Sequence, residues 1–212
     1  MKRSIPTAMV GGSFDPIHLG HLHLVHSVVS ATEYRRIILV PVGRNHFKPE
    51  ARPASTHHRL AMVHLGISAY RDLYPDDPPI ELVVDDCELN RVGISYTYDT
   101  VKALYLKYPI KGRLAVVMGD DLLPQLTEWH GYEALKELVT FVIIRREGNN
   151  HNFGDIAADL VYLDNPLLED SSTLIRDGCR SLKAEERLPH KIARLMPTEV
   201  AAYIEENQLY RP

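Results

Sequence analysis

Residues 7–21 have the sequence TAMVGGSFDPIHLGH, in which an apolar run ends at two glycines and a polar loop leads to two histidines. The apolar run predicts a buried strand. The glycines let the chain turn tightly and bring its backbone close to a ligand. A helix is expected over 17–31, and the N–H groups of its first turn favour an anion at the loop. We therefore predict a phosphate-binding loop that contains Gly11, Gly12, Ser13 and Phe14.

The rest of the chain alternates strand patterns with helix patterns. Short apolar runs without polar alternation are typical of strands buried on both faces. Such strands are expected over 36–42, 80–84, 113–118, 140–144 and 160–163, and helices over 55–70, 96–108, 171–179 and 197–207. The alternation implies right-handed crossovers and a parallel sheet. We expect an α/β fold with a doubly wound, Rossmann-like parallel sheet. A single domain would cover 1–212, with 171–212 as a small helical C-terminal extension.

Histidine is unusually frequent, with 11 residues, and four of them lie between positions 18 and 26. At about 100° per residue in a helix, His18 and His21 share the apolar face, whereas His23 and His26 lie off it. A neutral histidine at a helix start can donate an N–H to phosphate oxygens. Buried histidines with ordinary partners, or a His-x-x-His metal pair, are the alternatives. Beside the glycine loop, we interpret the first pair as phosphate-binding and assign no metal ligand.

Further candidates follow later strands and begin later helices. Gly119 and Asp121 come after the strand over 113–118, where a carboxylate can accept ribose hydroxyls; a helix cap is the alternative. The hydroxyls of residues 171–173 begin a helix that carries Arg176, and a guanidinium suits a phosphate. An ordinary N-cap is again the alternative.

Trp129, the sole tryptophan, is either a core residue or a stacking surface for a ring.

Composition restricts the class of protein. The 212 residues are 45% hydrophobic and 25% charged, which is ordinary globular usage. No apolar stretch approaches the ~20 residues of a membrane span, and no secretory signal is recognisable. The net charge of −4 argues against a nucleic-acid coat. The two cysteines form no CxxC, which indicates a reduced, cytoplasmic protein.

The loop GGSFDPIHLGH resembles the signature of the nucleotidyltransferase superfamily, whose hallmark is His-x-Gly-His. More matches follow in order: SYTYDT at 95–100, GDDL at 119–122, SSTLIR at 171–176, and an ending over 197–210. Together with Trp129 they resemble one family, the nicotinate-nucleotide adenylyltransferases of bacterial NAD synthesis. The resemblance implies a nucleotidyltransferase fold and transfer of AMP from ATP, with Mg²⁺, to nicotinate mononucleotide. The products would be deamido-NAD and pyrophosphate.

The resemblance also implies roles for the residues at matching positions. Catalysis would rest on His18, His21, Lys48 and Arg176. ATP would be bound by Gly11, Gly12, Ser13, Phe14, His21, Gly119, Asp121, Ser171, Ser172, Thr173 and Arg176. Nicotinate mononucleotide would be bound by Lys48, Ser95, Tyr96, Thr97, Trp129 and Arg146. Among these, Trp129 would stack on the pyridine ring and Thr97 would bond its polar substituent.

Some positions depart from the family pattern. Residues 45–48 are Asn-His-Phe-Lys where the family has a run like Pro-Pro-His-Lys, so Lys48 keeps the cation in an altered loop. Glu147 stands where the turn containing Arg146 usually has proline, and Asp170 where an apolar residue is common. Arg59 is expected either to support the loop over 44–53 or to be an ordinary surface arginine.

Other functions stay open on the sequence alone. One is a related nucleotidyltransferase acting on nicotinamide mononucleotide or phosphopantetheine. Another is a non-catalytic nucleotide- or metal-binding protein that uses the four histidines at 18–26. A piece of a tRNA synthetase, which shares a similar motif, is disfavoured by the negative charge and the lack of a Lys-Met-Ser-Lys-Ser loop. The partners expected are the two small substrates, with neither nucleic acid nor membrane, and assembly into a homo-oligomer is left open.

Overall fold

The computed structural model describes residues 3–43, 53–145, 155, 157–166, 171–183 and 186–211. The chain divides into two compact units. The first comprises Met1–Gly12, Ser27–Arg44 and Pro78–Leu167, and the second comprises Ser13–His26, Asn45–Asp77 and Leu168–Pro212. The division falls at the end of the first strand, so the strand and the loop after it belong to different units.

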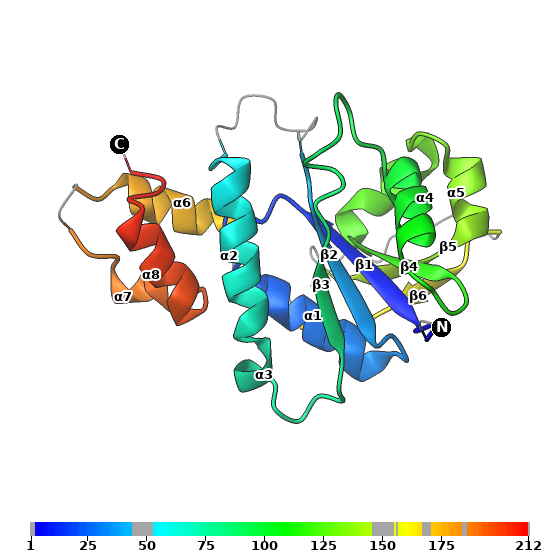
Figure 1. Cartoon of the computed structure of the whole chain (residues 1–212), viewed down its shortest axis with the longest axis horizontal. Coiled ribbons are helices and arrows are strands. Elements are labelled where there is room, and N and C mark those ends of the chain that lie inside the picture. Colours follow the sequence, from blue (N-terminus) through cyan, green and yellow to red (C-terminus); the bar gives the residue numbers. More distant parts are fainter. Residues whose placement is uncertain are drawn as a thin grey trace. The chain divides into compact units, whose positions relative to one another are not determined.

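The first unit holds a sheet of six parallel strands in the order β3-β2-β1-β4-β5-β6 (Figure 1). The strands are β1 (Thr7–Gly12), β2 (Arg36–Pro41), β3 (Glu81–Val84), β4 (Leu114–Gly119), β5 (Val139–Ile144) and β6 (Leu160–Tyr162). The parallel α/β sheet expected from the sequence is confirmed. The strand ends differ from the expected ones by one or two residues, because apolar runs define the middle of a strand better than its ends.

The strand order reverses beside β1. From β1 the chain moves outward to β2 and β3, then returns to β4 on the other side of β1. Val10 of β1 lies opposite both Leu39 of β2 and Val117 of β4. In open α/β sheets, ligands bind beyond the carboxyl ends of the strands at such a reversal. Gly12 and Gly119 end the two strands that meet there.

The main hydrophobic core of the first unit lies on one face of this sheet. That face packs against α4 (Thr97–Lys107), the 3₁₀ helix η1 (Asp120–Glu128) and α5 (Tyr132–Leu138). The core includes Met9, Ile38, Val116, Phe141, Val101, Leu104, Leu123, Leu126 and Leu135. Strand residues on the opposite face, such as Ala8 and Ile37, are fully buried as well. Burial on both faces explains why the strand sequences show no polar alternation.

Helix α1 (Leu19–Ala31) crosses from the second unit into the first. Its buried residues are the expected ones: Leu22, Val25, Val28 and Val29. The helix begins two residues later than expected, because the carbonyl oxygen of His18 accepts the first helical hydrogen bonds, from the backbone N–H groups of His21 and Leu22. His18 therefore precedes the first turn of α1.

The second unit contains the remaining helices. They are α2 (Thr56–Ser68), α3 (Tyr70–Leu73), α6 (Ser172–Arg180), α7 (His190–Ala193) and α8 (Thr198–Glu206). Two serines cap helices of this unit: Ser55 Oγ accepts from the His58 N–H at 3.3 Å, and Ser171 Oγ accepts from the Leu174 N–H at 3.1 Å. The short helices α3, α5, α7 and η1 were not expected from the sequence.

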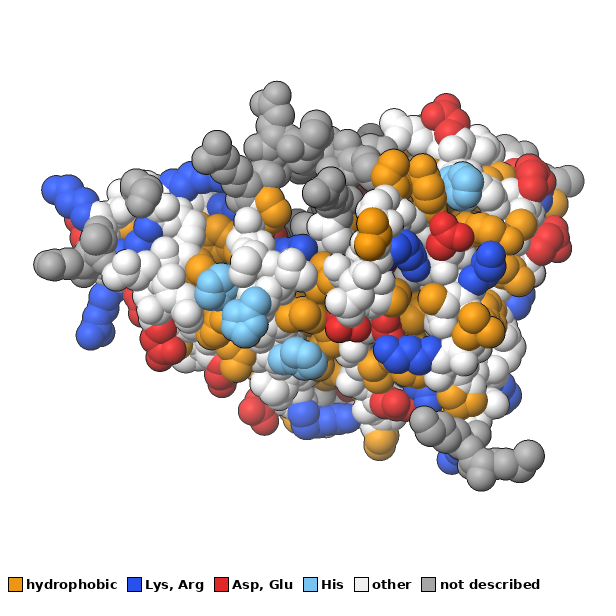
Figure 2. Space-filling model, turned by 45° about the horizontal axis from the view of Figure 1, so that its top comes forward, with side chains coloured by type: hydrophobic (Ala, Val, Ile, Leu, Met, Phe, Trp, Pro, Cys, Tyr) orange, Lys and Arg blue, Asp and Glu red, His pale blue; other side chains and the backbone are white. Residues whose placement is uncertain are grey.

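On the face drawn in Figure 2, the acidic and basic side chains that the structure describes are interspersed. Among the helices of the described ranges, none has both the length and the apolar character needed to cross a bilayer.

Candidate active site

In the second unit, the loop after β1 is held in an unusual conformation. Phe14 is fully buried and has a φ of 44°, in the left-handed region that large side chains seldom adopt. Arg59 of α2, only 3% exposed, donates from its terminal nitrogen to the carbonyl oxygen of Ser13 at 2.8 Å. The expectation of a surface arginine is therefore wrong. The loop that Arg59 was alternatively expected to support lies mostly outside the described residues.

The two histidines assigned to phosphate binding lie together. The ring centroids of His18 and His21 are 3.8 Å apart, and the Phe14 ring lies 5.0 Å from that of His21. The backbone N–H of His18 donates to Nδ1 of His21 at 3.2 Å. A ring nitrogen that accepts a hydrogen bond carries no proton, so the proton of a neutral His21 ring is assigned to Nε2. Nε2 is then the atom through which His21 can donate to a phosphate oxygen.

The other two histidines of the cluster have different neighbours. His26 Nδ1 lies 2.9 Å from Asp77 Oδ1, and its ring stacks on Tyr74 with the centroids 4.3 Å apart. His23 Nδ1 lies 3.4 Å from the Tyr74 hydroxyl. Within the described ranges, which include all four histidines, no group of three or more His, Cys, Asp or Glu side chains could hold a metal ion. The four histidines thus form two pairs rather than one metal-binding cluster.

Helix α6 contacts the same loop through two of its side chains. Ser172 Oγ donates to the carbonyl oxygen of Pro16 at 3.0 Å. One terminal nitrogen of Arg176 donates to the carbonyl oxygen of Asp15 at 2.7 Å, and the other donates to Thr173 Oγ1 at 3.3 Å. The guanidinium is therefore fixed against the loop backbone. A positive charge held beside a turn and two histidines favours an anionic ligand.

Asp15 is a residue of this loop to which the sequence analysis assigned no role. Its side chain is buried, and Oδ1 accepts from the backbone N–H of Ala54 at 3.0 Å and from the Tyr210 hydroxyl at 2.8 Å. Oδ2 lies 3.8 Å from a terminal nitrogen of Arg176. Burial and the neighbouring Asp15 carboxylate raise the pKa of Tyr210, so the hydroxyl remains a donor. The sequence shows only an acidic residue in this loop, because the partners that bury and bond Asp15 are far along the chain.

In the first unit, the predicted nucleotide residues lie at the ends of β1 and β4. A Cβ placed on Gly11 would meet nothing within 4 Å, which leaves the backbone accessible to a ligand. The carbonyl oxygen of Gly12 accepts from the Val42 N–H at 2.9 Å. Gly119 is the N-cap residue of η1, and Asp121 lies in the first turn of that helix, half-buried. Gly119 and Asp121 therefore occupy the helix-start positions that the sequence analysis named as the alternative, at the edge where ligands are expected.

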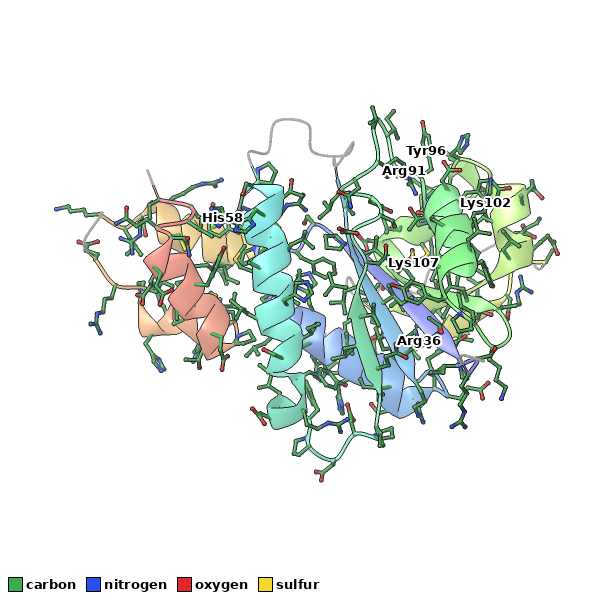
Figure 3. The ribbon with its side chains drawn as sticks, viewed as in Figure 1. Arg36, His58, Arg91, Tyr96, Lys102 and Lys107 are labelled. Carbon is green, nitrogen blue, oxygen red and sulfur yellow. The ribbon has the colours of Figure 1, made fainter. Side chains whose placement is uncertain are left out.

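The first unit also brings together the two segments predicted for the acceptor. The ring of Tyr96, just before α4, stacks on His130 with the centroids 4.2 Å apart (Figure 3). Gly131 has a φ of 72°, and a Cβ there would lie only 3.0 Å from the Tyr98 ring. Trp129 directly precedes His130 and packs half-buried against the hydrophobic core. The tryptophan is thus neither wholly a core residue nor wholly exposed.

A buried carboxylate anchors the segment before α4. Glu88 Oε1 accepts from the Thr100 hydroxyl at 2.7 Å, and Arg91 donates to Thr100 Oγ1 at 3.1 Å (Figure 3). Burial raises the pKa of the Glu88 carboxyl, although Thr100 and Arg91 oppose that shift. A Cβ on Gly43 would lie 2.6 Å from the carbonyl oxygen of Glu88. Gly43, which follows β2, therefore contacts the backbone of Glu88, which follows β3, at a distance that leaves room only for glycine.

Two predicted site residues, Lys48 and Arg146, lie outside the described residues. The departures from the family pattern at 45–48, Glu147 and Asp170 lie outside them as well.

Comparisons with known proteins agree on one family. Residues 9–178 match a family model described as Cytidylyltransferase-like. A probable nicotinate-nucleotide adenylyltransferase of Treponema pallidum is 32% identical over 96% of this chain and 98% of its own length. One from Oceanobacillus iheyensis is 33% identical over 95% of each. One from Halalkalibacterium halodurans is 33% identical over all of this chain and 92% of its own.

Solved structures show the same fold. Plasmodium falciparum nicotinic acid mononucleotide adenylyltransferase, complexed with NaAD, superimposes with a TM-score of 0.71 at 20% identity over 97% of both chains. A putative nicotinate-nucleotide adenylyltransferase from Vibrio parahaemolyticus superimposes with a TM-score of 0.63 at 18% identity, over 97% of this chain and 95% of its own. The Rossmann-like nucleotidyltransferase fold expected from the resemblance is confirmed.

Proposed function

The chain belongs to the nicotinate-nucleotide adenylyltransferase family, and from that premise we propose that it joins ATP and nicotinate mononucleotide to give deamido-NAD and pyrophosphate in NAD biosynthesis. One structural observation supports the proposal above all others. The tilted rings of His18 and His21, with centroids 3.8 Å apart, lie beside a loop in which the buried Phe14 has a left-handed φ and to which Arg176 is fixed. Paired ring donors and a guanidinium around one turn suit the phosphates of a nucleotide.

The reaction needs positioning more than proton transfer. An oxygen of the acceptor's 5′-phosphate attacks the α-phosphorus of ATP, and the bond between that phosphorus and the bridging oxygen breaks. The electron pair of this bond leaves with pyrophosphate. Both phosphates are already ionised near neutral pH, so no strong general base is required. The protein would act by holding the reacting atoms in line and by stabilising the charge that develops.

We assign the phosphate-binding roles to the second unit. His21 Nε2 and His18 would donate to the triphosphate as charge accumulates, and Arg176 would draw charge towards the leaving pyrophosphate. The backbone of Ser13 and Phe14 would follow the phosphates. Lys48 would add a further cation to the acceptor or the triphosphate. ATP would enter as its Mg²⁺ complex, with the metal bound mainly by phosphate oxygens and water.

We assign recognition of the two nucleosides to the first unit. Gly119 and Asp121 would hold the adenosine ribose. Trp129 would stack on the pyridine ring, and the next residue in the chain, His130, pairs its ring with that of Tyr96. Ser95 and Thr97 would bond the ring's carboxylate, and Arg146 would support the dinucleotide. A site that offers donors to a carboxylate should reject the amide, whose NH₂ group would face them.

The test is a comparison of acceptors. The purified protein is given MgATP with nicotinate mononucleotide, nicotinamide mononucleotide or phosphopantetheine, and both pyrophosphate release and product mass are measured. We expect fast release with the acid and a product with the mass of deamido-NAD. Preference for the amide or phosphopantetheine would keep the fold but contradict the roles of Thr97 and Trp129. Nucleotide binding without release for any acceptor would contradict the proposed reaction and favour a nucleotide sensor.

A further inference from the structure

The Asp15 carboxylate is the meeting point of three separate segments of the second unit. Its Oδ1 atom accepts from the backbone N–H of Ala54 at 3.0 Å and from the hydroxyl of Tyr210 at 2.8 Å. Asp15 itself is 4% exposed. Tyr210 follows α8 and has a φ of 63°, a left-handed conformation that the local structure must maintain. The geometry aims this hydroxyl at a buried negative charge.

The neighbouring Arg176 does not form a close ion pair with that carboxylate. Its terminal nitrogen donates instead to the carbonyl oxygen of Asp15 at 2.7 Å, while the nearest carboxylate oxygen, Oδ2, is 3.8 Å away. Guanidinium and carboxylate groups at this range ordinarily close to a bidentate pair near ~2.8 Å. The Ala54 N–H and the Tyr210 hydroxyl both donate to Oδ1, whereas Oδ2 is the oxygen nearest to Arg176.

We propose that Tyr210 is a positioning residue for the nucleotide phosphates, which acts through Asp15 by keeping the guanidinium of Arg176 from being captured by the Asp15 carboxylate. The inference rests on the proposed function, in that Arg176 binds ATP. Tyr210 touches no phosphate. Its hydroxyl supplies the hydrogen bond that the buried carboxylate would otherwise obtain from Arg176.

Removal of the hydroxyl has a defined consequence. In Tyr210→Phe the ring still fills its place, but Oδ1 loses one donor and the buried charge is undercompensated. Among the described residues, Arg176 is the cation in ion contact with this carboxylate, 3.8 Å from Oδ2, and is therefore placed to replace that donor. A closed Asp15–Arg176 pair would compete with the phosphates, so affinity for MgATP would fall whereas affinity for the acceptor would not.

The experiment compares Tyr210→Phe with a matched control, Tyr203→Phe. The Tyr203 hydroxyl lies 2.9 Å from His58 Nδ1, between α8 and α2, and so forms a similar contact of the C-terminal segment away from the loop (Figure 3). MgATP affinity is measured by calorimetry without acceptor, together with KM for each substrate and Tm. We expect Tyr210→Phe to weaken MgATP binding about 5- to 20-fold, with the KM for nicotinate mononucleotide within twofold. Tyr203→Phe should bind MgATP as the wild type does.

A double-mutant cycle tests whether the effect passes through the proposed residues. In an Asp15→Asn background no charge can capture Arg176, and in an Arg176→Ala background no guanidinium can be captured. Adding Tyr210→Phe to either background should change MgATP affinity less than twofold. Three results would overturn the inference. The first is that Tyr210→Phe binds MgATP as tightly as the wild type, and the second is that Tyr203→Phe loses as much MgATP affinity as Tyr210→Phe. The third is that Tyr210→Phe causes the same loss of MgATP affinity in both backgrounds as it does in the wild type. Failure of the proposed function is distinct, since the wild type would then bind MgATP but form no deamido-NAD.

Discussion

The nucleotide loop and the acceptor segments are held by different kinds of interaction. The loop over 13–18 is fixed by two guanidinium groups that donate to its backbone, from the buried Arg59 and the partly buried Arg176. The segments around Tyr96 and Trp129 rest on aromatic contacts, and Tyr96 is 38% exposed. The loop is thus suited to hold fixed donors against developing charge, which requires preorganisation. The aromatic segments are suited to binding a ring, for which stacking tolerates small shifts.

The largest effect on turnover should follow from removing the ring of His21, which lies at the start of α1 beside the nucleotide loop. His21→Ala should lower turnover by about 10²- to 10³-fold, the usual cost of losing one group that stabilises transition-state charge. Its Tm should change little, because the helix and its buried face remain. His64→Ala, an exposed histidine on α2, is the matched control. Normal turnover in His21→Ala would remove this residue from the site and contradict the stated difference between the two regions.

A smaller and more selective effect is expected from the acceptor segments. Trp129→Ala should raise the KM for nicotinate mononucleotide about 5- to 150-fold, which corresponds to ~1–3 kcal/mol of ring stacking. The KM for ATP should stay within about twofold, and Trp129→Phe should recover part of the loss. Tyr162→Ala, on the exposed part of β6, is the control for loss of an aromatic ring. An unfolded Trp129→Ala protein would instead support a purely core role.

Substitutions at two glycines distinguish a role in packing, at Gly43, from a role in ligand binding, at Gly11. Gly43→Ala should lower the free energy of unfolding by about 1–3 kcal/mol, because its Cβ would lie 2.6 Å from the carbonyl oxygen of Glu88. Gly11→Ala should leave stability unchanged, because a Cβ there meets nothing within 4 Å. Denaturant unfolding measures both. If the backbone of Gly11 approaches the phosphates, Gly11→Ala should weaken MgATP binding without lowering stability. Equal destabilisation of Gly11→Ala and Gly43→Ala would contradict the different roles assigned to the two glycines.

The smallest effect concerns the charge of Glu88. Burial raises the pKa of this carboxyl, so the folded state holds the proton more strongly than the unfolded state and stability falls as pH rises above about 4.5. Glu88→Gln removes the charge but keeps an acceptor for Thr100. Its Tm should match that of the wild type at low pH and exceed it by at most about 2–4 °C at neutral pH. A constant difference across the pH range would show that the carboxyl charge is not responsible.

The sequence predicted those features that depend on local pattern. Apolar runs identified the six strands of the described sheet, and the buried face of α1 followed from helical spacing. The N-cap that the sequence offered as an alternative at 171–173 is present at Ser171, and such a cap depends only on a partner three residues ahead. The pairing of Tyr96 with the Trp129 segment was anticipated only through the family resemblance, because the two segments meet in space and not in sequence.

What escaped the sequence analysis depends on distant partners. Asp15 and Tyr210 are 195 positions apart, and no pattern within either segment predicts their hydrogen bond. Arg59 was not recognised as buried, because its burial depends on the loop against α2 rather than on its own helix. The helix η1 contains Pro124 and is unusually long for a 3₁₀ helix, so neither periodicity nor propensity predicted it.

The most direct test follows the adenylyl group itself. The protein is incubated with ATP labelled at the α-phosphate, Mg²⁺ and nicotinate mononucleotide, and the label is traced in products and in protein. The account predicts that label appears in deamido-NAD in a one-to-one ratio with pyrophosphate, and that none is covalently attached to the protein during turnover. Label trapped on the protein, or label that never reaches a dinucleotide while ATP is bound, would contradict direct transfer to nicotinate mononucleotide.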